Sequence, residues 1–147
     1  MISNSKILPW TYISIAAFSL VGLTDSIYLT VEHLAGRTVP CRVVTGCSEV
    51  LHSAYATVGN LPLAGLGVVA YFCVLSLAIL AIFGFTKTAN FILPLVAVMF
   101  VATLYLFYLQ AFVIQAFCFY CLISGVITLL LLVSTSLNRF LVLRQKQ

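Results

Sequence analysis

Hydrophobic positions dominate this chain and form long runs that no charged residue interrupts. Three runs stand out: Ile7–Thr24 with 18 residues, Val50–Thr86 with 37 and Thr88–Asn138 with 51. A membrane-spanning helix needs about 20 apolar residues. The first run, continued to Leu34, fits one such helix, the second run fits one, and the third must hold two. Since the strict alternation of a membrane barrel is missing, the pattern predicts an all-α integral membrane protein, a bundle of four transmembrane helices.

The ends of the four spans follow from turn-forming residues. We expect spans over roughly residues 8–34, 61–85, 89–112 and 117–138. Proline is tolerated in the first turn of a helix, and Pro9 and Pro62 stand where two of the spans begin. Gln110 and Gln115 bracket the expected turn before the last span. No linker divides the sequence, so we expect one membrane domain over residues 1–147.

The segment 35–60 between the first two spans carries a short helical pattern of its own. From Ser48 to Val58, the apolar residues recur at helical spacing. This segment is too short to cross a bilayer, so it predicts an interfacial half-helix that caps the bundle. An amphipathic lid without any chemical role is an alternative interpretation of the same pattern.

Composition and charge agree with a membrane protein and suggest its orientation. Hydrophobic residues make up 63% of the chain and charged residues 7%, against about 25% charged in a typical soluble domain. This argues against a cytosolic globular protein, a nucleic-acid binder and a disordered segment. One side of the membrane would hold five basic residues, namely Lys6, Lys87, Arg139, Arg144 and Lys146, and the other only Arg37 and Arg42. By the positive-inside rule, both termini are expected in the cytoplasm and the loop 35–60 outside.

Four of the five cysteines would then lie on the outer side of the membrane. Cys41 and Cys47 belong to the outward loop, and Cys118 and Cys121 form a C-x-x-C pair at the outer start of the fourth span. The outer face opens to an oxidising compartment, where disulfides form. Cys73 lies alone in the second span, and we expect it to be a small buried hydrophobic residue.

The position of the C-x-x-C pair favours redox chemistry. Unpaired N–H groups at the start of a helix stabilise a thiolate, and a spacing of three residues puts both sulfurs on one helix face. Cys41 and Cys47 would then supply a relay, because disulfides move by thiolate attack. Two alternatives remain open from spacing alone: two structural disulfides in a membrane scaffold or transporter, or a zinc ion held by four thiolates.

Asp25 is the ionisable residue deepest in the first span. Charged groups within spans usually face the protein interior and serve a function. Asp25 would lie in the outer third of the helix, where it either helps to form a site or is solvated near the membrane surface. Both interpretations stay open.

Several longer stretches resemble the vitamin K epoxide reductase family, and most closely its bacterial members that oxidise thiols. They are Gly22-Leu-Thr-Asp-Ser-Ile-Tyr-Leu-Thr, Cys47-Ser-Glu-Val-Leu-His-Ser-Ala-Tyr-Ala-Thr, Asn60-Leu-Pro-Leu-Ala-Gly-Leu-Gly and Cys118-Phe-Tyr-Cys. The resemblance covers most of the chain and includes the four spans and both cysteine pairs.

The resemblance implies a route for electrons. Cys118 and Cys121 would be the active-site pair beside a quinone of the ubiquinone, menaquinone or vitamin K type, with no metal. Cys41 and Cys47 would be shuttle cysteines that accept electrons from a thioredoxin-like thiol oxidoreductase outside the cytoplasm, which we expect to be a separate protein rather than a fused domain. Ser53 matches a position that contacts the quinone in the family, and we add Asp25 to the expected quinone site.

The protein would then lie in the lipid bilayer of a bacterial inner membrane and support disulfide formation, without binding nucleic acid. One departure matters for an alternative activity, the reduction of vitamin K or its epoxide. Animal members carry Thr-Thr-Tyr-Ala just after the second active-site cysteine, where this chain has Ile123-Ser-Gly-Val. The missing tyrosine argues against epoxide reduction.

Overall fold

Four long helices form the protein, as the charge-free runs predict. The computed structural model describes residues 7–37, 46–59 and 61–144. The long helices are α1 (Ile7–Leu34), α3 (Leu63–Ile82), α4 (Ala89–Tyr108) and α5 (Phe119–Arg144), and α4 continues into a π-helical segment, η2 (Leu109–Ile114). All four are long and apolar enough to cross a membrane. The predicted all-α membrane bundle is therefore confirmed.

Two helix ends differ from the predicted spans. Helix α3 ends at Ile82 rather than at residue 85, because Gly84 adopts a positive φ of 97° and the short 3-10 turn η1 (Thr86–Thr88) reverses the chain. Helix α5 continues beyond residue 138 to Arg144. The last buried residue of α5 is Asn138, which accepts a hydrogen bond of 3.3 Å from Thr11 on α1.

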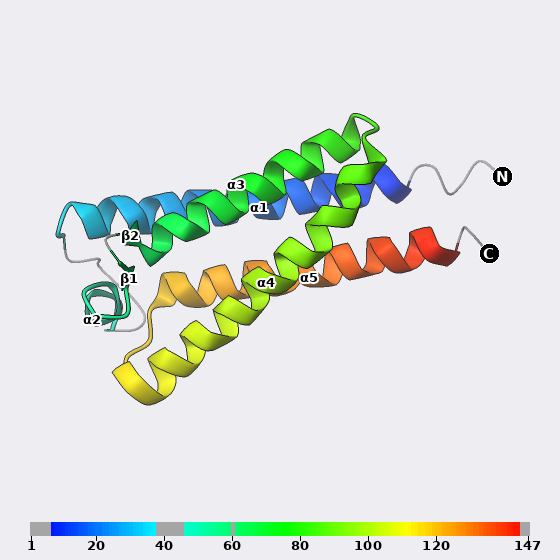
Figure 1. Cartoon of the computed structure of the whole chain (residues 1–147). Helices are drawn as coiled ribbons and strands as arrows, with labels where there is room; N and C mark the ends of the chain where they lie inside the picture. Colours follow the sequence, from blue (N-terminus) through cyan, green and yellow to red (C-terminus); the bar gives the residue numbers. More distant parts are fainter. Residues whose placement is uncertain (1–6, 38–45, 60, 145–147) are drawn as a thin grey trace.

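The bundle core lies where α1, α3, α4 and α5 meet. Ile15, Val74, Val96 and Leu131, one residue from each helix, are fully buried there. Helix α1 packs along α3 and α5, while α4 leans across α5 (Figure 1). The outer surfaces expose many large apolar side chains, as expected for helices that face lipid rather than water.

A buried tyrosine links three of the helices. The Tyr71 hydroxyl on α3 lies 2.9 Å from both Ser124 Oγ and Thr128 Oγ1 on α5. Its ring packs so closely on Gly22 of α1 that a Cβ there would overlap it. A polar group in an apolar bundle stays satisfied only through such contacts, so Tyr71 fixes how α1, α3 and α5 meet.

The loop between α1 and α3 is only partly helical, and here the prediction was wrong in extent. Helix α2 covers Cys47–Leu51, not 48–58, and the chain then turns into a two-residue hairpin, β1 (Thr57–Val58) against β2 (Leu61–Pro62). Gly59 has a φ of 65° in the hairpin turn. Extended pairing with the residues before α3 thus replaces the last helical turns.

The expectation for Cys73 was also wrong. Its side chain is exposed on α3, not buried in the core. The reason is its place on the helix: Tyr71, Val74 and Ala78 occupy the inward face, which leaves Cys73 on a face turned toward lipid.

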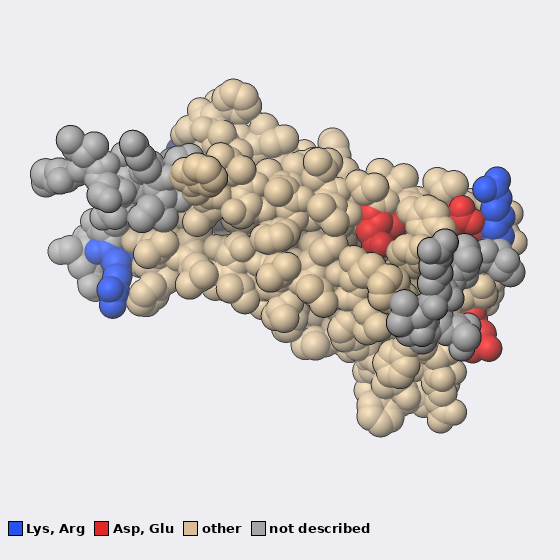
Figure 2. All heavy atoms as spheres, turned by 180° about the vertical axis from the view of Figure 1, so that it is seen from behind, with Lys and Arg blue, Asp and Glu red and all other residues tan. Residues whose placement is uncertain are grey.

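Both ends of the described chain lie at the same end of the bundle, and α2 lies at the other (Figure 1). Figure 2 shows the acidic side chains gathered toward one end of the molecule. In the chain they are Asp25 and Glu32 in the second half of α1 and Glu49 in α2. Polar chemistry is therefore concentrated at the end that carries α2.

Candidate functional site

Three cysteines meet at the end of the bundle that carries α2. Cys47 is the first residue of α2, Cys118 directly precedes α5, and Cys121 lies in the first turn of α5. Cys47 and Cys118 are both buried in one cluster with Leu29 and Leu51, and Cys121 packs against it. Cys47 thus shares one site with two cysteines that lie 71 and 74 residues further along the chain. The predicted shuttle residue Cys41 lies outside the described residues.

The cysteines of this site are in different redox states. Cys47 is disulfide-bonded, whereas Cys118 and Cys121 are free thiols. A hydrogen bond from the Cys121 side chain, helped by N–H groups at the start of α5 and opposed by burial, lowers the pKa of Cys118 to about 7. Cys118 is therefore largely a thiolate just above neutral pH, and the thiolate is the form that exchanges disulfides.

A glycine lets α2 approach this thiol pair. A Cβ on Gly46 would lie 2.8 Å from the Phe117 amide nitrogen and 2.8 Å from the Ala116 Cβ. Any side chain at position 46 would push α2 away from the turn that carries Cys118. Gly46 is a functional candidate that the sequence analysis missed, because nothing in the sequence says which backbone it meets.

A cavity of about 140 Å³ opens beside the cysteines. All the long helices and α2 contribute to its walls, which are mostly apolar, and Cys121 is part of the wall. Ligand pockets for whole drug-sized molecules are larger, about 300 Å³ or more. The cavity therefore suits one apolar ring system rather than an entire chain-bearing lipid.

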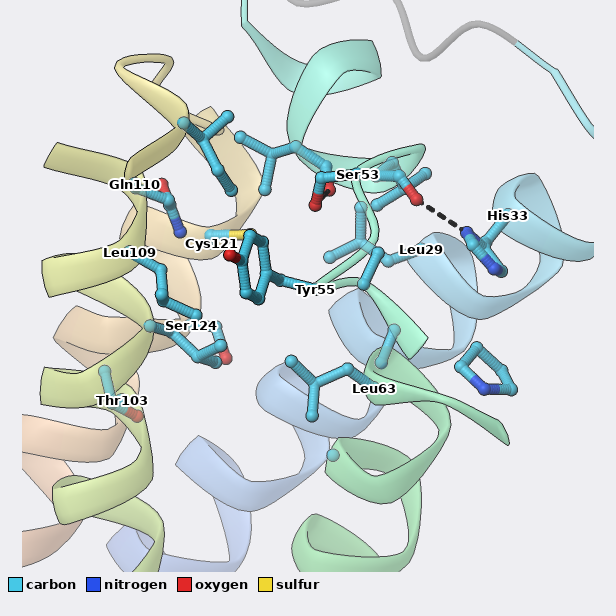
Figure 3. A pocket seen from close by; sticks show the side chains of 18 of the residues that line it. Leu29, His33, Ser53, Tyr55, Leu63, Thr103, Leu109, Gln110, Cys121 and Ser124 are labelled. Carbon is cyan, nitrogen blue, oxygen red and sulfur yellow. Dashed lines mark hydrogen bonds between the residues drawn. The ribbon is translucent and has the colours of Figure 1, made fainter. Parts of the chain in front are cut away.

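The short helix α2 and the residues that follow it cover the cavity. His33 Nδ1 at the end of α1 lies 2.8 Å from the Leu51 carbonyl oxygen, a bond drawn in Figure 3. This contact holds the end of α2 over the cavity. The His33 and His52 rings also stack, with centroids 6.1 Å apart.

Ser53 lies in the cavity wall, next to the end of α2. Its hydroxyl donates a hydrogen bond of 2.8 Å to the Val50 carbonyl oxygen. The hydroxyl hydrogen of Ser53 is thus already bonded to the backbone, and Ser53 can only accept a hydrogen bond from a ligand in the cavity. In contrast, Figure 3 shows Tyr55 reaching into the cavity toward Cys121, and no hydrogen bond of the Tyr55 hydroxyl is found within the described part of the chain.

Asp25 does not line the cavity. Its charge nevertheless reaches Cys118, and its Oδ2 atom is buried without a hydrogen-bond partner among the described residues. A carboxylate oxygen in such a place is costly unless another group or a proton satisfies it. The structure therefore brings Asp25 near the thiol pair but not into the cavity wall.

Phe107 from α4 packs closely on Gly125 of α5. A Cβ on Gly125 would overlap the Phe107 ring. Both residues line the cavity. The two residues thus form an apolar floor of the cavity, and a larger residue at 125 would need Phe107 to move.

Within residues 7–37, 46–59 and 61–144, no group of three or more His, Cys, Asp or Glu side chains is arranged to hold a metal ion. The residues that line the cavity fit a quinone: the wall is mostly apolar, and it also contains the Cys121 thiol and polar side chains such as Ser53 and Gln110. Such a group would accept two electrons and two protons there.

Gln110 is a second residue whose importance the sequence did not reveal. In the sequence Gln110 marks only an expected turn, yet its side chain is 2% exposed and lines the cavity. A polar residue within a 51-residue uncharged run was the available signal, but a single amide in a span is just as compatible with helix packing.

The comparison with protein families agrees with this geometry. The model of the vitamin K epoxide reductase family matches residues 13–136, a range that contains the described cysteines and the whole cavity wall. A comparison with curated proteins finds no match. Because the family match covers most of the chain, this protein belongs to the vitamin K epoxide reductase family.

Proposed function

We propose that this membrane oxidoreductase oxidises protein thiols outside the cytoplasm and passes the electrons to a quinone. The observation that supports this most is the meeting of Cys47 and Cys118 in one buried cluster, beside an apolar cavity whose wall contains Cys121. Because Cys47 lies beside Cys118, thiol–disulfide exchange between them would allow a relay, and the cavity offers an end point for the electrons.

In the proposed relay, a thioredoxin-like partner first reduces the loop disulfide by attack on Cys41, and its own dithiol becomes a disulfide. The Cys47 thiolate then attacks Cys118, so that a Cys47–Cys118 bond forms, the Cys118–Cys121 bond breaks and Cys121 leaves with the electron pair. Cys41 next attacks Cys47, which restores the loop disulfide and releases Cys118.

A quinone held in the cavity would accept two electrons and two protons from the reduced pair, and Cys118 and Cys121 would then form a disulfide again. The observed state, with Cys47 oxidised and Cys118 and Cys121 reduced, corresponds to the point just before this last transfer.

Two further residues belong to the proposed quinone site. Ser53 would contact the quinone from the cavity wall, where its lone pairs suit the hydroxyl of a quinol product better than a quinone carbonyl. Asp25 would exchange protons near the thiol pair. Asp25→Asn should slow quinone reduction in a pH-dependent way, and an unchanged pH profile would remove Asp25 from the site.

We place the thiol site on the outer side of a bacterial inner membrane, with both termini in the cytoplasm. The five-to-two distribution of Lys and Arg supports this orientation. An oxidising compartment is also where a thiol oxidase has substrates.

The decisive experiment compares single cysteine variants of the purified protein with a dithiol donor and a quinone acceptor. Cys118→Ala and Cys121→Ala should each abolish quinone reduction. Cys73→Ala is the matched control, because Cys73 is a free thiol that faces lipid away from the site, and it should react at the wild-type rate. Retained quinone reduction in either active-site variant would contradict the proposal, and turnover with vitamin K epoxide in place of quinone would favour the alternative activity.

A further inference from the structure

A buried glutamine lies between the two active-site cysteines. Gln110 belongs to the π-helical segment η2, and its exposed fraction is only 2%. Single π-helical turns are rare and occur often at functional sites, because they rotate one side chain out of the regular helical order. Here the segment turns a polar side chain into the bundle, toward the start of α5.

The Gln110 side chain has a defined orientation. Its Oε1 accepts a hydrogen bond of 3.1 Å from the Cys118 backbone N–H. Because the oxygen must face this donor, the amide nitrogen faces the opposite way. There it meets Cys121, with which Gln110 forms a side-chain hydrogen bond, and Figure 3 shows the labelled side chains directed toward one another.

We propose that Gln110 is a positioning residue for the Cys118–Cys121 pair: its amide bridges the two cysteines and donates to the Cys121 sulfur when that sulfur carries negative charge. This inference rests on the proposed function. In the internal exchange, Cys121 is the leaving group and receives the electron pair of the broken disulfide. An N–H donor stabilises this charge in a site that contains few other donors.

The bridge should also affect the redox potential of the Cys118–Cys121 pair, which can be measured without a quinone or a partner protein. A donor to the sulfur favours the reduced pair over the disulfide, so its loss should make the pair easier to oxidise. We expect Gln110→Met to shift the equilibrium of this pair with glutathione about tenfold toward the disulfide, which corresponds to a potential about 30 mV more negative.

Loss of the bridge should change kcat for quinone reduction but not KM for the quinone. Gln110→Met should lower kcat for quinone reduction about tenfold and leave KM for the quinone unchanged, because the exchange suffers and the cavity keeps its shape. Gln110→Glu keeps an oxygen for the Cys118 N–H. Its activity should rise as pH falls, since only the protonated carboxyl can donate to sulfur, whereas the wild-type protein should lack this rise.

Gln115→Asn is the matched control. Gln115 is an exposed glutamine of the same turn, with a φ of 55° that asparagine tolerates, and its replacement should alter neither the potential nor kcat. Gln110→Met would overturn the inference if it lowered only the unfolding temperature, with the potential and kcat of the folded protein unchanged. A rise in KM alone would also overturn it, and would assign Gln110 to quinone binding. Because the potential is measured without quinone, it tests the bridge even if quinone reduction itself proves absent.

Discussion

Gly46 and Phe117 meet backbone to backbone, and this contact seats Cys47 beside Cys118. A Cβ at position 46 would lie 2.9 Å from the Phe117 carbonyl oxygen, closer than van der Waals contact allows. The two segments are far apart in the sequence: one is the loop between α1 and α3, and the other is the turn before α5. Their fit decides how closely Cys47 approaches Cys118.

Gly46→Ala should therefore slow the relay between the pairs. The added methyl group must displace backbone on one side, which costs about 1–3 kcal/mol in a well-packed site, and we expect at least a tenfold slower quinone reduction with a protein dithiol as donor. A small dithiol that reduces Cys118–Cys121 directly should restore most of the rate. Gly65→Ala is the control, since its Cβ would meet the nearest atom at an ordinary 3.4 Å. Wild-type rates in Gly46→Ala would refute the role of this contact.

Thiol reactivity should depend on pH in a way that identifies Cys118. With its pKa lowered to about 7 from the usual 9, Cys118 is a thiolate above neutral pH and a thiol below it. In a Cys73→Ala background, alkylation of the Cys118 peptide followed by mass spectrometry should show a midpoint near pH 7. Because Cys118 is buried, its absolute rate of alkylation should be slow, and the midpoint is read from the relative rates across the pH range.

The Cys121 side chain is the largest cause of that shift. In Cys121→Ala, the midpoint for Cys118 should accordingly move up toward pH 9. Identical midpoints in the two proteins would show that Cys121 does not stabilise the Cys118 thiolate.

At the floor of the cavity, the double variant Gly125→Ala/Phe107→Leu should be more stable to unfolding than Gly125→Ala alone. Gly125→Ala pushes a methyl group into the Phe107 ring, and overpacking of this kind costs about 1–3 kcal/mol of the free energy of unfolding. Adding Phe107→Leu should recover part of this loss. A double-mutant cycle, measured by unfolding in detergent, gives the coupling between the two positions. Strictly additive effects would mean that Gly125 and Phe107 do not share this space.

Tyr55 should contribute to quinone affinity through its hydroxyl group. The side chain reaches into the cavity (Figure 3), and one neutral hydrogen bond is worth about 0.5–1.5 kcal/mol. Tyr55→Phe should raise KM for the quinone roughly two- to tenfold at unchanged kcat. Tyr105→Phe serves as the control, because Tyr105 is exposed on α4 and takes no part in the cavity. A KM equal to that of the wild-type protein would exclude the Tyr55 hydroxyl as a quinone contact.

The sequence predicted the large features of this protein because they follow from solvent preference alone. A run of residues without charge can only be accommodated in lipid as a helix, so Ile7–Thr24 and its two counterparts imply four spans. The C-x-x-C pair at the start of α5 was likewise visible as a pattern. The role of each cysteine in the relay stays a prediction.

The predictions that were wrong, and the residues that were missed, depend on contacts between distant segments of the chain. Cys73 was expected inside because cysteine is usually buried, but apolar residues on a membrane helix face lipid as readily as protein, so composition does not reveal the inward face. The helix after Cys47 ends early because β1 pairs with β2. Gly46 and Gln110 escaped notice because their importance lies in the atoms opposite them, Phe117 and the cysteine pair.

Helix α1 has 28 residues, which at about 1.5 Å per residue makes it roughly 42 Å long. A bilayer has an apolar core of about 30 Å, so the end of α1 that carries His33 reaches the headgroup layer. For the proposed reaction, the site then lies at the boundary between the lipid and the aqueous phase, and each phase supplies one reactant. One reactant arrives by lateral diffusion within a sheet of lipid and the other through open water, so membrane composition and protein abundance would each limit the turnover independently.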